Sequence, residues 1–303
     1  MNASPASERP LAGRVAVVTG SSRGAGRGIA VELGAAGATV YVSARSTRAE
    51  PARGYEQLLA LQQGARLPGS IEQTAEEVSA AGGQGIPVRC DHGDEAQVQA
   101  LFAQVQREQG RLDLLVNNAW GGHESFDGVF ERPFWEHPLA HWDSMIDRGV
   151  RYHLLAARAA APLFVAQRHG LIVGTTFWDS GRYLRGNLYY DLAKAALVRL
   201  AYAFAEELRP YGVASLALSP GWMRTEFVLA AYQTDEAHWH EVPALARTES
   251  PRYLGRAVAA LAADAQVLGR SGAAPSVAEL ARHYGFTDID GRQPPAFELG
   301  DGG

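Results

Sequence analysis

The sequence predicts an α/β fold in which a doubly wound parallel β-sheet forms a single domain. Short apolar runs rich in β-branched residues alternate with longer segments in which apolar residues have helical spacing. This alternation indicates βαβ units, whose right-handed crossovers place helices against a parallel sheet. A glycine-rich stretch follows the first apolar run, as expected for a turn that leads from a strand into a helix at a ligand site.

The predicted elements follow one another along most of the chain. Strands are expected near residues 14–18, 39–43, 85–90, 112–116, 170–174 and 213–218. Helices are expected near residues 26–36, 70–81, 94–109, 139–165, 190–209, 252–263 and 276–284. In such a sheet the ligand crevice lies at the carboxyl ends of the strands, so residues that follow the strands are the candidates for the site.

The length and composition favour one domain. A chain of 303 residues that is 47% hydrophobic can bury one large core. We expect this domain over residues 11–290, with a flexible leader at 1–10 and a flexible tail at 291–303. Residues 46–69 exceed a minimal fold and are predicted to form an insertion after the second strand, with a short helix at 54–62.

The charge and the cysteine content indicate which partners and which cellular location to expect. The formal net charge is −5 and no basic face is evident, so nucleic acid is not an expected partner. The single cysteine, Cys90, fits a reducing cytosol and predicts a cytoplasmic location. No run reaches roughly 18 apolar residues, so no membrane partner is expected. Nine histidines without tight spacing and one thiol do not predict a metal site.

Three glycines after the first predicted strand have the spacing GxxxGxG. A diphosphate needs backbone N–H groups and a helix N-terminus at close range, and a Cβ in the turn would block its approach. We therefore predict that Gly20, Ser22, Gly24 and Gly26 bind a dinucleotide. The alternative is an ordinary glycine-rich turn between a strand and a helix.

The second predicted strand lacks the acidic residue that would hold a ribose 2′-hydroxyl. Arg45 follows this strand instead, and Arg23 lies within the glycine-rich turn. A guanidinium binds phosphate through a bidentate fork, so the two arginines favour a 2′-phosphate. We predict NADP(H) as the cofactor. The alternative is that both arginines are solvated surface charges.

Tyr190 and Lys194 lie four residues apart on a predicted helix, which places them on one face. Reduction of a carbonyl needs a proton donor within hydrogen-bond reach of its oxygen. A nearby ammonium would lower the pKa of a tyrosine from its ordinary value near 10. We predict Tyr190 as the acid/base and Lys194 as the group that tunes it and binds the cofactor. A chance Tyr/Lys pair is the alternative.

With these two motifs in place, the chain over about residues 11–265 resembles the short-chain dehydrogenase/reductase family. Asp91 after the third strand, Asn117 and Ala119 after the fourth, and Pro220, Gly221 and Thr225 after the sixth match the family's motifs in order. The resemblance implies a Rossmann-type fold, a nicotinamide oxidoreductase and cofactor contacts at these positions.

The resemblance also implies features outside the cofactor site. Residues 226–250 would form a mobile lid over the substrate. Dimers or tetramers would assemble through the helices at 139–165 and 190–209. Phe134-Trp135-Glu136 and the segment 278–286 further resemble the dehydrogenase/reductase member 1 subgroup, whose members are described as NADPH-linked carbonyl reductases.

Three positions depart from the family pattern. Phe177 stands where the family has the serine that holds the substrate oxygen, so this role passes to Thr176, to Ser180 or to neither. Gly149 stands where the family has an asparagine that supports a water and the lysine. Trp120 replaces the glycine of the family's NNAG motif and is expected to reshape the pocket.

Large aromatic residues follow several strands and predict a pocket for a flat, apolar or aromatic small molecule. The candidate substrate-binding residues are Trp120, Phe177, Trp178 and Trp222. His123 and Asp179 are weaker candidates for polar roles at the same place, because a lone loop histidine is more often a surface residue.

The sequence thus predicts an NADP(H)-dependent reductase acting on a carbonyl or alcohol, with Tyr190, Lys194 and Thr176 as catalytic residues. The departures keep two alternatives open. One is a regulatory module that binds NADP(H) without turnover. The other is an enzyme that reduces an imine or a carbon–carbon double bond.

Overall fold

The computed structural model describes residues 9–51, 68–124, 127, 129, 131–178, 180–184 and 186–297. The predicted helix at 54–62, Asp179 and most of the predicted leader lie outside these residues, as does the end of the predicted tail.

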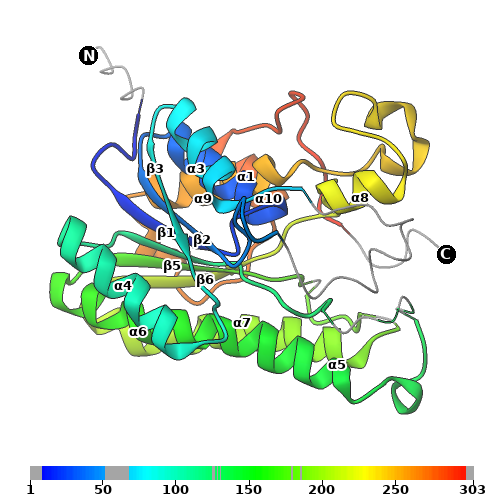
Figure 1. Cartoon of the computed structure of the whole chain (residues 1–303), viewed down its shortest axis with the longest axis horizontal. Helices are drawn as coiled ribbons and strands as arrows, with labels where there is room; N and C mark the ends of the chain where they lie inside the picture. Colours follow the sequence, from blue (N-terminus) through cyan, green and yellow to red (C-terminus); the bar gives the residue numbers. More distant parts are fainter. Residues whose placement is uncertain are drawn as a thin grey trace.

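Six parallel strands form one sheet in the order β3-β2-β1-β4-β5-β6 (Figure 1). Each strand pairs in parallel with its neighbours, and Val17 at the centre faces Tyr41 on one side and Leu115 on the other. The strands are β1 (Val15–Thr19), β2 (Thr39–Ala44), β3 (Gln84–Arg89), β4 (Leu114–Asn117), β5 (Gly170–Thr175) and β6 (Val213–Leu218). The doubly wound parallel α/β fold is therefore confirmed.

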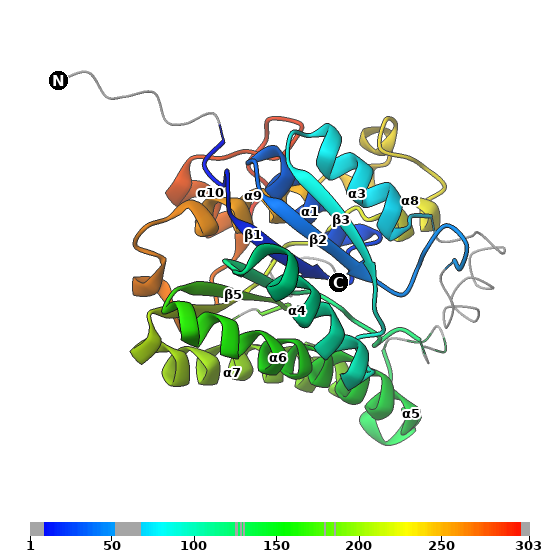
Figure 2. The same ribbon diagram turned by 60° about the vertical axis from the view of Figure 1, so that its left-hand side comes forward.

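Helices cover both faces of this sheet, as Figures 1 and 2 show. One face carries α1 (Gly24–Ala35), α3 (Ile71–Ala80), α9 (Pro251–Ala263) and α10 (Val277–Tyr284). The other face carries α4 (Glu95–Gln109), α6 (Arg151–Gln167) and α7 (Leu188–Leu208). Shorter elements are α5 (Ala140–Trp142), a π-helical segment η2 (Asp143–Val150), α8 (Glu226–Ala231), and 3₁₀ turns at Phe134–Glu136, Arg209–Tyr211, Trp239–Glu241, Pro243–Leu245 and Val267–Arg270.

Strand alternation divides the core into two clusters, one on each face. Val18 and Val116 point toward the α1 side and pack with Ile29. Val17 and Leu115, their neighbours in sequence, point toward the α4 and α6 side. Both faces are buried, which explains why these strands are continuous apolar runs without polar alternation.

The single helix expected at 139–165 is divided into α5, η2 and α6. The wide turns of η2 end next to Gly149, against which the indole of Trp120 packs. Isolated π-helical turns inside longer helices occur frequently at functional sites.

A buried carboxylate anchors the amino ends of the two central strands. Asp113 accepts hydrogen bonds from the backbone N–H of Val15 and from Arg14, both at 2.9 Å, and pairs with Arg111. Burial alone would raise the pKa of the Asp113 carboxyl, but the hydrogen bonds from Arg111, Val15 and Arg14 outweigh it and lower the pKa. The charged carboxylate therefore stabilises the fold.

Asp113→Asn is expected to destabilise the protein by about 1–3 kcal/mol at pH 7, because charge-assisted hydrogen bonds are lost. Since the folded-state pKa of Asp113 is lowered, this stability is present above the unfolded pKa and is lost as the pH falls through the folded pKa. Denaturant titrations at pH 7 and pH 3, the second of which lies below the ordinary pKa of an aspartate, check this, with exposed Asp143→Asn as the control. An equal loss of stability at both pH values would contradict it.

Candidate active site

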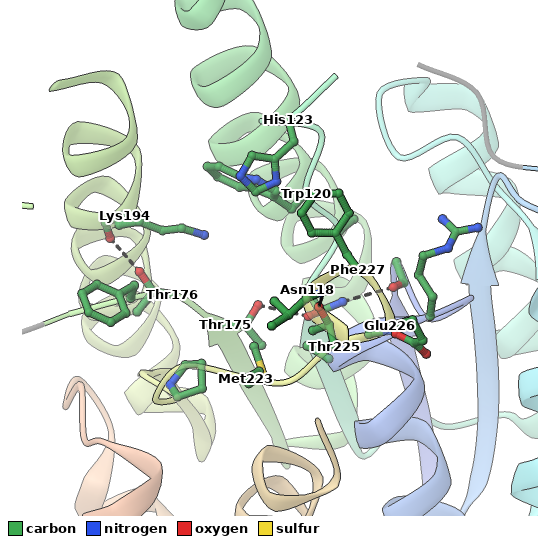
Figure 3. Close-up of a pocket in the computed structure, with 18 of the residues that line it drawn as sticks. Asn118, Trp120, His123, Thr175, Thr176, Lys194, Met223, Thr225, Glu226 and Phe227 are labelled. Carbon is green, nitrogen blue, oxygen red and sulfur yellow. Dashed lines mark hydrogen bonds between the residues drawn. The ribbon is translucent and has the colours of Figure 1, made fainter. Parts of the chain in front are cut away.

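A cavity of about 1810 Å³ opens at the carboxyl ends of the strands. Loops after all six strands and the segment 226–247 contribute to its wall. Figure 3 labels lining residues that follow β4, β5 and β6. The predicted site residues that line it are Gly20, Ser22, Arg23, Gly24, Arg45, Asp91, Ala119, Trp120, Thr176, Phe177, Tyr190, Lys194, Pro220, Gly221, Trp222 and Thr225. The fold thus brings residues about 200 positions apart to one place.

Three predicted residues do not line the cavity. Asn117 is 1% exposed within β4, and its amide donates to the carbonyl of His153 at 3.2 Å. Gly26 lies one turn inside α1, where a Cβ would come within 2.3 Å of the carbonyl oxygen of Gly20. Trp178 is not part of this lining, and its backbone N–H and carbonyl both bind the Ser219 hydroxyl. Asn117 and Gly26 therefore support the site from behind, and a substrate contact of Trp178 stays a prediction.

The glycine-rich turn has the close packing that its spacing predicts. Gly20 has φ +66°, and a Cβ there would lie 2.7 Å from the Cα of Ala119. The turn thus passes directly against the loop after β4 and presents the N-terminus of α1 to the cavity. A helix N-terminus with accessible N–H groups favours an anion, so this end of the cavity suits a diphosphate.

A carboxylate of the segment 226–250 lies at this helix N-terminus. Gly24 N–H donates to Glu226 Oε2 at 2.9 Å, and Arg27 pairs with the same side chain at 3.2 Å. Glu226 is the first residue of α8, next to Thr225 (Figure 3). An anion bound at Gly24 would therefore compete with Glu226.

Both predicted phosphate-binding arginines already have partners. Arg45 forms an ion pair with Glu124, whose side chain is 4% exposed and also pairs with Arg148 at 3.0 Å. Arg23 donates from Nε to the carbonyl of Pro68 at 2.9 Å. Both arginines line the cavity, so these contacts hold their side chains beside it rather than in bulk solvent.

Tyr190 and Lys194 lie on the first turns of α7, where the side chain of Asn187 caps the helix by accepting from Tyr190 N–H at 3.0 Å. Lys194 reaches from α7 into the cavity toward Trp120 (Figure 3). Its Nζ lies 3.7 Å from the centroid of the Trp120 ring and 5.2 Å from that of Tyr190. The predicted pair is thus adjacent and faces the cavity.

Burial is the main cause of the shifted pKa values of Tyr190 and Lys194. It raises the pKa of Tyr190 to about 12 and lowers the pKa of Lys194 to about 7. The expected lowering of the Tyr190 pKa is therefore wrong for the protein alone, because desolvation of the phenolate outweighs any help from the ammonium. His123 also lines the cavity, and burial followed by repulsion from Lys194 lowers its pKa to about 4. Its imidazole is neutral at pH 7.

The hydroxyl predicted to hold the substrate oxygen is engaged elsewhere. Thr176 Oγ1 donates to the backbone carbonyl of Lys194 at 2.8 Å, which ties the end of β5 to α7 (Figure 3). In this arrangement its proton does not reach into the cavity. Phe177 occupies the wall beside it, and Ser180 is exposed and not part of the lining.

The segment 226–250 places only some of its aromatic residues at the cavity. Phe227 lines it, whereas Trp239 packs over Arg224 at 4.2 Å. The Arg224 side chain is 0% exposed and pairs with Asp288 and Glu236 at 3.4 and 3.1 Å. This buried ion-pair cluster joins the segment to the C-terminal residues.

Sequence reasoning missed two residues that shape the site. Asn118 lines the cavity and donates to the carbonyls of Thr19 and Gly20, linking the ends of β4 and β1. The second asparagine of the NNA motif was the available signal. Glu249 is 1% exposed, and its carboxyl lies against Gly221, where a Cβ would come within 2.7 Å of Oε2. No local pattern marked Glu249.

Burial raises the pKa of Glu249 from its ordinary value near 4.5 to about 8, and Asp288 adds repulsion. A carboxyl whose folded pKa is raised lowers stability as the pH rises from its unfolded pKa to its folded pKa. The neutral form is therefore the one that suits its place beside the Pro220-Gly221 turn.

Glu249→Gln, which removes this charge, is expected to stabilise the protein by roughly 1–3 kcal/mol at pH 8.5. The gain should vanish at pH 4.5, where the glutamate is neutral in the folded state. Thermal unfolding at both pH values checks this. A variant that is less stable than the wild type at pH 8.5 would contradict it.

No group of three or more His, Cys, Asp or Glu side chains in the described ranges is arranged to hold a metal ion. No helix in these ranges is long and apolar enough to cross a membrane.

The chain is similar to known oxidoreductases. Residues 20–269 match the family model described as enoyl-(acyl carrier protein) reductase. The chain is 40% identical over 289 residues to dehydrogenase/reductase SDR family member 1 of Mus musculus, which covers 93% of this chain and 85% of that protein.

Solved structures agree with this likeness. A short chain dehydrogenase from Mycobacterium thermoresistibile superposes with a TM-score of 0.75 at 28% identity, covering 96% of this chain and 94% of that one. A metagenomic short-chain oxidoreductase in complex with NADP superposes with a TM-score of 0.63 at 28% identity, covering 84% and 93%.

Proposed function

The chain belongs to the short-chain dehydrogenase/reductase family, and we propose that it is an NADP(H)-dependent carbonyl reductase. Its substrate would be an apolar or aromatic small molecule bearing a carbonyl or alcohol. The observation that carries this proposal is that Tyr190 and Lys194 line the same cavity as the glycine-rich turn. Neither motif would specify the reaction without the other.

The described residues fit such a cofactor. The N-terminus of α1 would bind its diphosphate, and the Pro220-Gly221 turn with Thr225 would line the nicotinamide end. Bound NADPH would supply the hydride at its nicotinamide ring. Tyr190 would hold the proton that passes to the substrate oxygen, and the Lys194 ammonium would favour the phenolate left behind.

The aromatic lining supports an apolar substrate. Trp120, Phe177, Trp222 and Phe227 all contribute to the cavity wall, and Tyr183 lies at its margin. Flat apolar surfaces of this kind favour a ring-containing carbonyl compound.

Tyr190→Phe is expected to lower kcat by about 10²–10⁴-fold while leaving the NADPH Kd within a few-fold, because only the proton donor is lost. NADPH oxidation across a panel of ketones and quinones, with a binding titration, measures both. Tyr189→Phe is the control, since Tyr189 packs against His137 and His141 away from the cavity. A near-normal rate in Tyr190→Phe would exclude this mechanism.

The choice of NADP(H) rests on Arg23 and Arg45 beside the cavity and on the absence of an acidic residue at the end of β2. The similar metagenomic oxidoreductase is in complex with NADP, which agrees with this choice. A 2′-phosphate would exchange the present partners of these arginines for a stronger anion.

Arg45→Ala and Arg23→Ala are each expected to weaken NADPH binding by about 10-fold or more, with little effect on NADH. Arg148→Ala is the matched control, because Arg148 pairs with the same Glu124 but does not line the cavity. Fluorescence titrations with both cofactors measure the ratio. An equal loss of affinity for NADPH and NADH would show that no 2′-phosphate site is present.

Reduction of an imine or a carbon–carbon double bond is the second candidate. The hydrogen bond from Thr176 to the Lys194 carbonyl favours it, because the Thr176 hydroxyl then does not donate to a substrate oxygen. An imine has less need of such a donor. Turnover of imines or enones but not ketones would select this candidate, and tight NADPH binding without any turnover would indicate a regulatory module.

We further propose a homodimer or homotetramer in the cytoplasm. Leu154 on α6 and Leu192 and Tyr202 on α7 are large apolar residues that are 40–43% exposed. Packing against a second copy would remove the apolar surface of these side chains from water.

The cytoplasmic location is supported by the single cysteine, which is a buried free thiol and fits a reducing compartment.

A further inference from the structure

Lys194 is the only lysine in the sequence, since every other residue among the 28 Lys and Arg is an arginine. A guanidinium stays charged in proteins, whereas a buried amine can lose its proton. Among the lysine and arginine side chains of this chain, only the one at position 194 can therefore lose its charge near neutral pH.

The ammonium of Lys194 meets aromatic rings. Its Nζ lies 3.7 Å from the centroid of the Trp120 ring, well within the range of a cation–π interaction. In the part of the chain that the structure describes, no carboxylate forms an ion pair with Lys194. Trp120 also packs edge-on against Tyr190, with ring centroids 5.9 Å apart. The indole thus contacts both members of the Tyr/Lys pair.

Two glycines make room for this indole. A Cβ on Gly149 would lie 2.5 Å from Cζ3 of Trp120, and a Cβ on Gly122 would lie 2.2 Å from Cζ2. Both approaches are shorter than real Cβ contacts. The ring therefore occupies the space into which a side chain at position 149 would project. The departures at Trp120 and Gly149 are coupled by sterics.

We propose that Trp120 is a positioning residue whose indole face holds the Lys194 ammonium in place, in the space that an asparagine at position 149 would otherwise fill. The cation–π interaction stabilises the charged amine relative to the neutral amine. The effect of Trp120 on the protonation of Lys194 does not depend on the proposed reductase function. Its effect on the reaction rate does.

Other groups near Lys194 do not titrate in the same range. Tyr190 faces it from α7, with its pKa raised by burial to about 12. His123 after β4 and His153 on α6 have their pKa values lowered, mainly by burial, to about 4 and about 3. A transition of Lys194 near pH 7 can therefore be assigned without overlap.

The experiment follows the lysine directly. Protein grown with lysine carrying ¹³C at Cε gives one lysine signal, whose chemical shift reports the protonation of Nζ as the pH is changed. Trp120→Leu keeps an apolar side chain but removes the π face, and Trp120→Phe retains a smaller π face. The midpoint of the Lys194 transition is expected to fall by about one pH unit in Trp120→Leu and to stay near the wild-type value in Trp120→Phe.

A separate variant tests whether the Trp120 indole needs the space left by Gly149. Gly149→Ala is expected to push the indole off the ammonium and to lower the midpoint in the same direction as Trp120→Leu. Gly269→Ala is the matched control, because a Cβ there would meet no atom within 4 Å. Gly149→Ala still tests the proposal if circular dichroism shows that Trp120→Leu does not fold.

An unchanged midpoint in a folded Trp120→Leu or Gly149→Ala protein would overturn the proposal and leave Trp120 as a wall of the pocket. The titration needs neither cofactor nor substrate, so it stands apart from any failure to find a reaction. If turnover is found, the pH profile of kcat is expected to shift with the Lys194 midpoint in Trp120→Leu. A change confined to KM would contradict a positioning role.

Discussion

A single, half-buried lysine ammonium packed against aromatic rings is the constraint on which the site depends. Burial opposes its charge and lowers the pKa of Lys194 to about 7, while the Trp120 face offsets part of that cost. The backbone carbonyl of the same residue receives the Thr176 hydroxyl, so β5 and α7 are joined at Lys194. Moving this residue would disturb the cavity wall, the helix and the candidate acid/base together.

The parallel sheet is what brings these parts together. Because all six strands point the same way, the loops after them converge on one edge and enclose one cavity. Supports behind the lining then fix its shape: Gly26 lets α1 approach the first turn, and Glu249 backs the Pro220-Gly221 turn.

The strands, most helices and the Tyr190/Lys194 pair could be predicted because they follow from local periodicity and motif spacing. What failed needed contacts between distant residues. The sequence could not show that the Thr176 hydroxyl bonds to α7 or that burial raises the Tyr190 pKa. Trp120 and Gly149 each appeared as separate departures, and only the fold shows that one side chain fills the space left by the other.

Transfer of deuterium from NADPH that carries deuterium at both hydrogen positions of nicotinamide C4 tests the central claim most directly. The protein would be incubated with the labelled cofactor and a panel of ketones, quinones, enones and imines, and the products analysed by mass spectrometry. The account predicts a product that carries deuterium on the former carbonyl carbon, formed by the wild-type protein. Saturating NADPH binding with no deuterium in any product would contradict a reductase and favour a protein that binds the cofactor for another purpose.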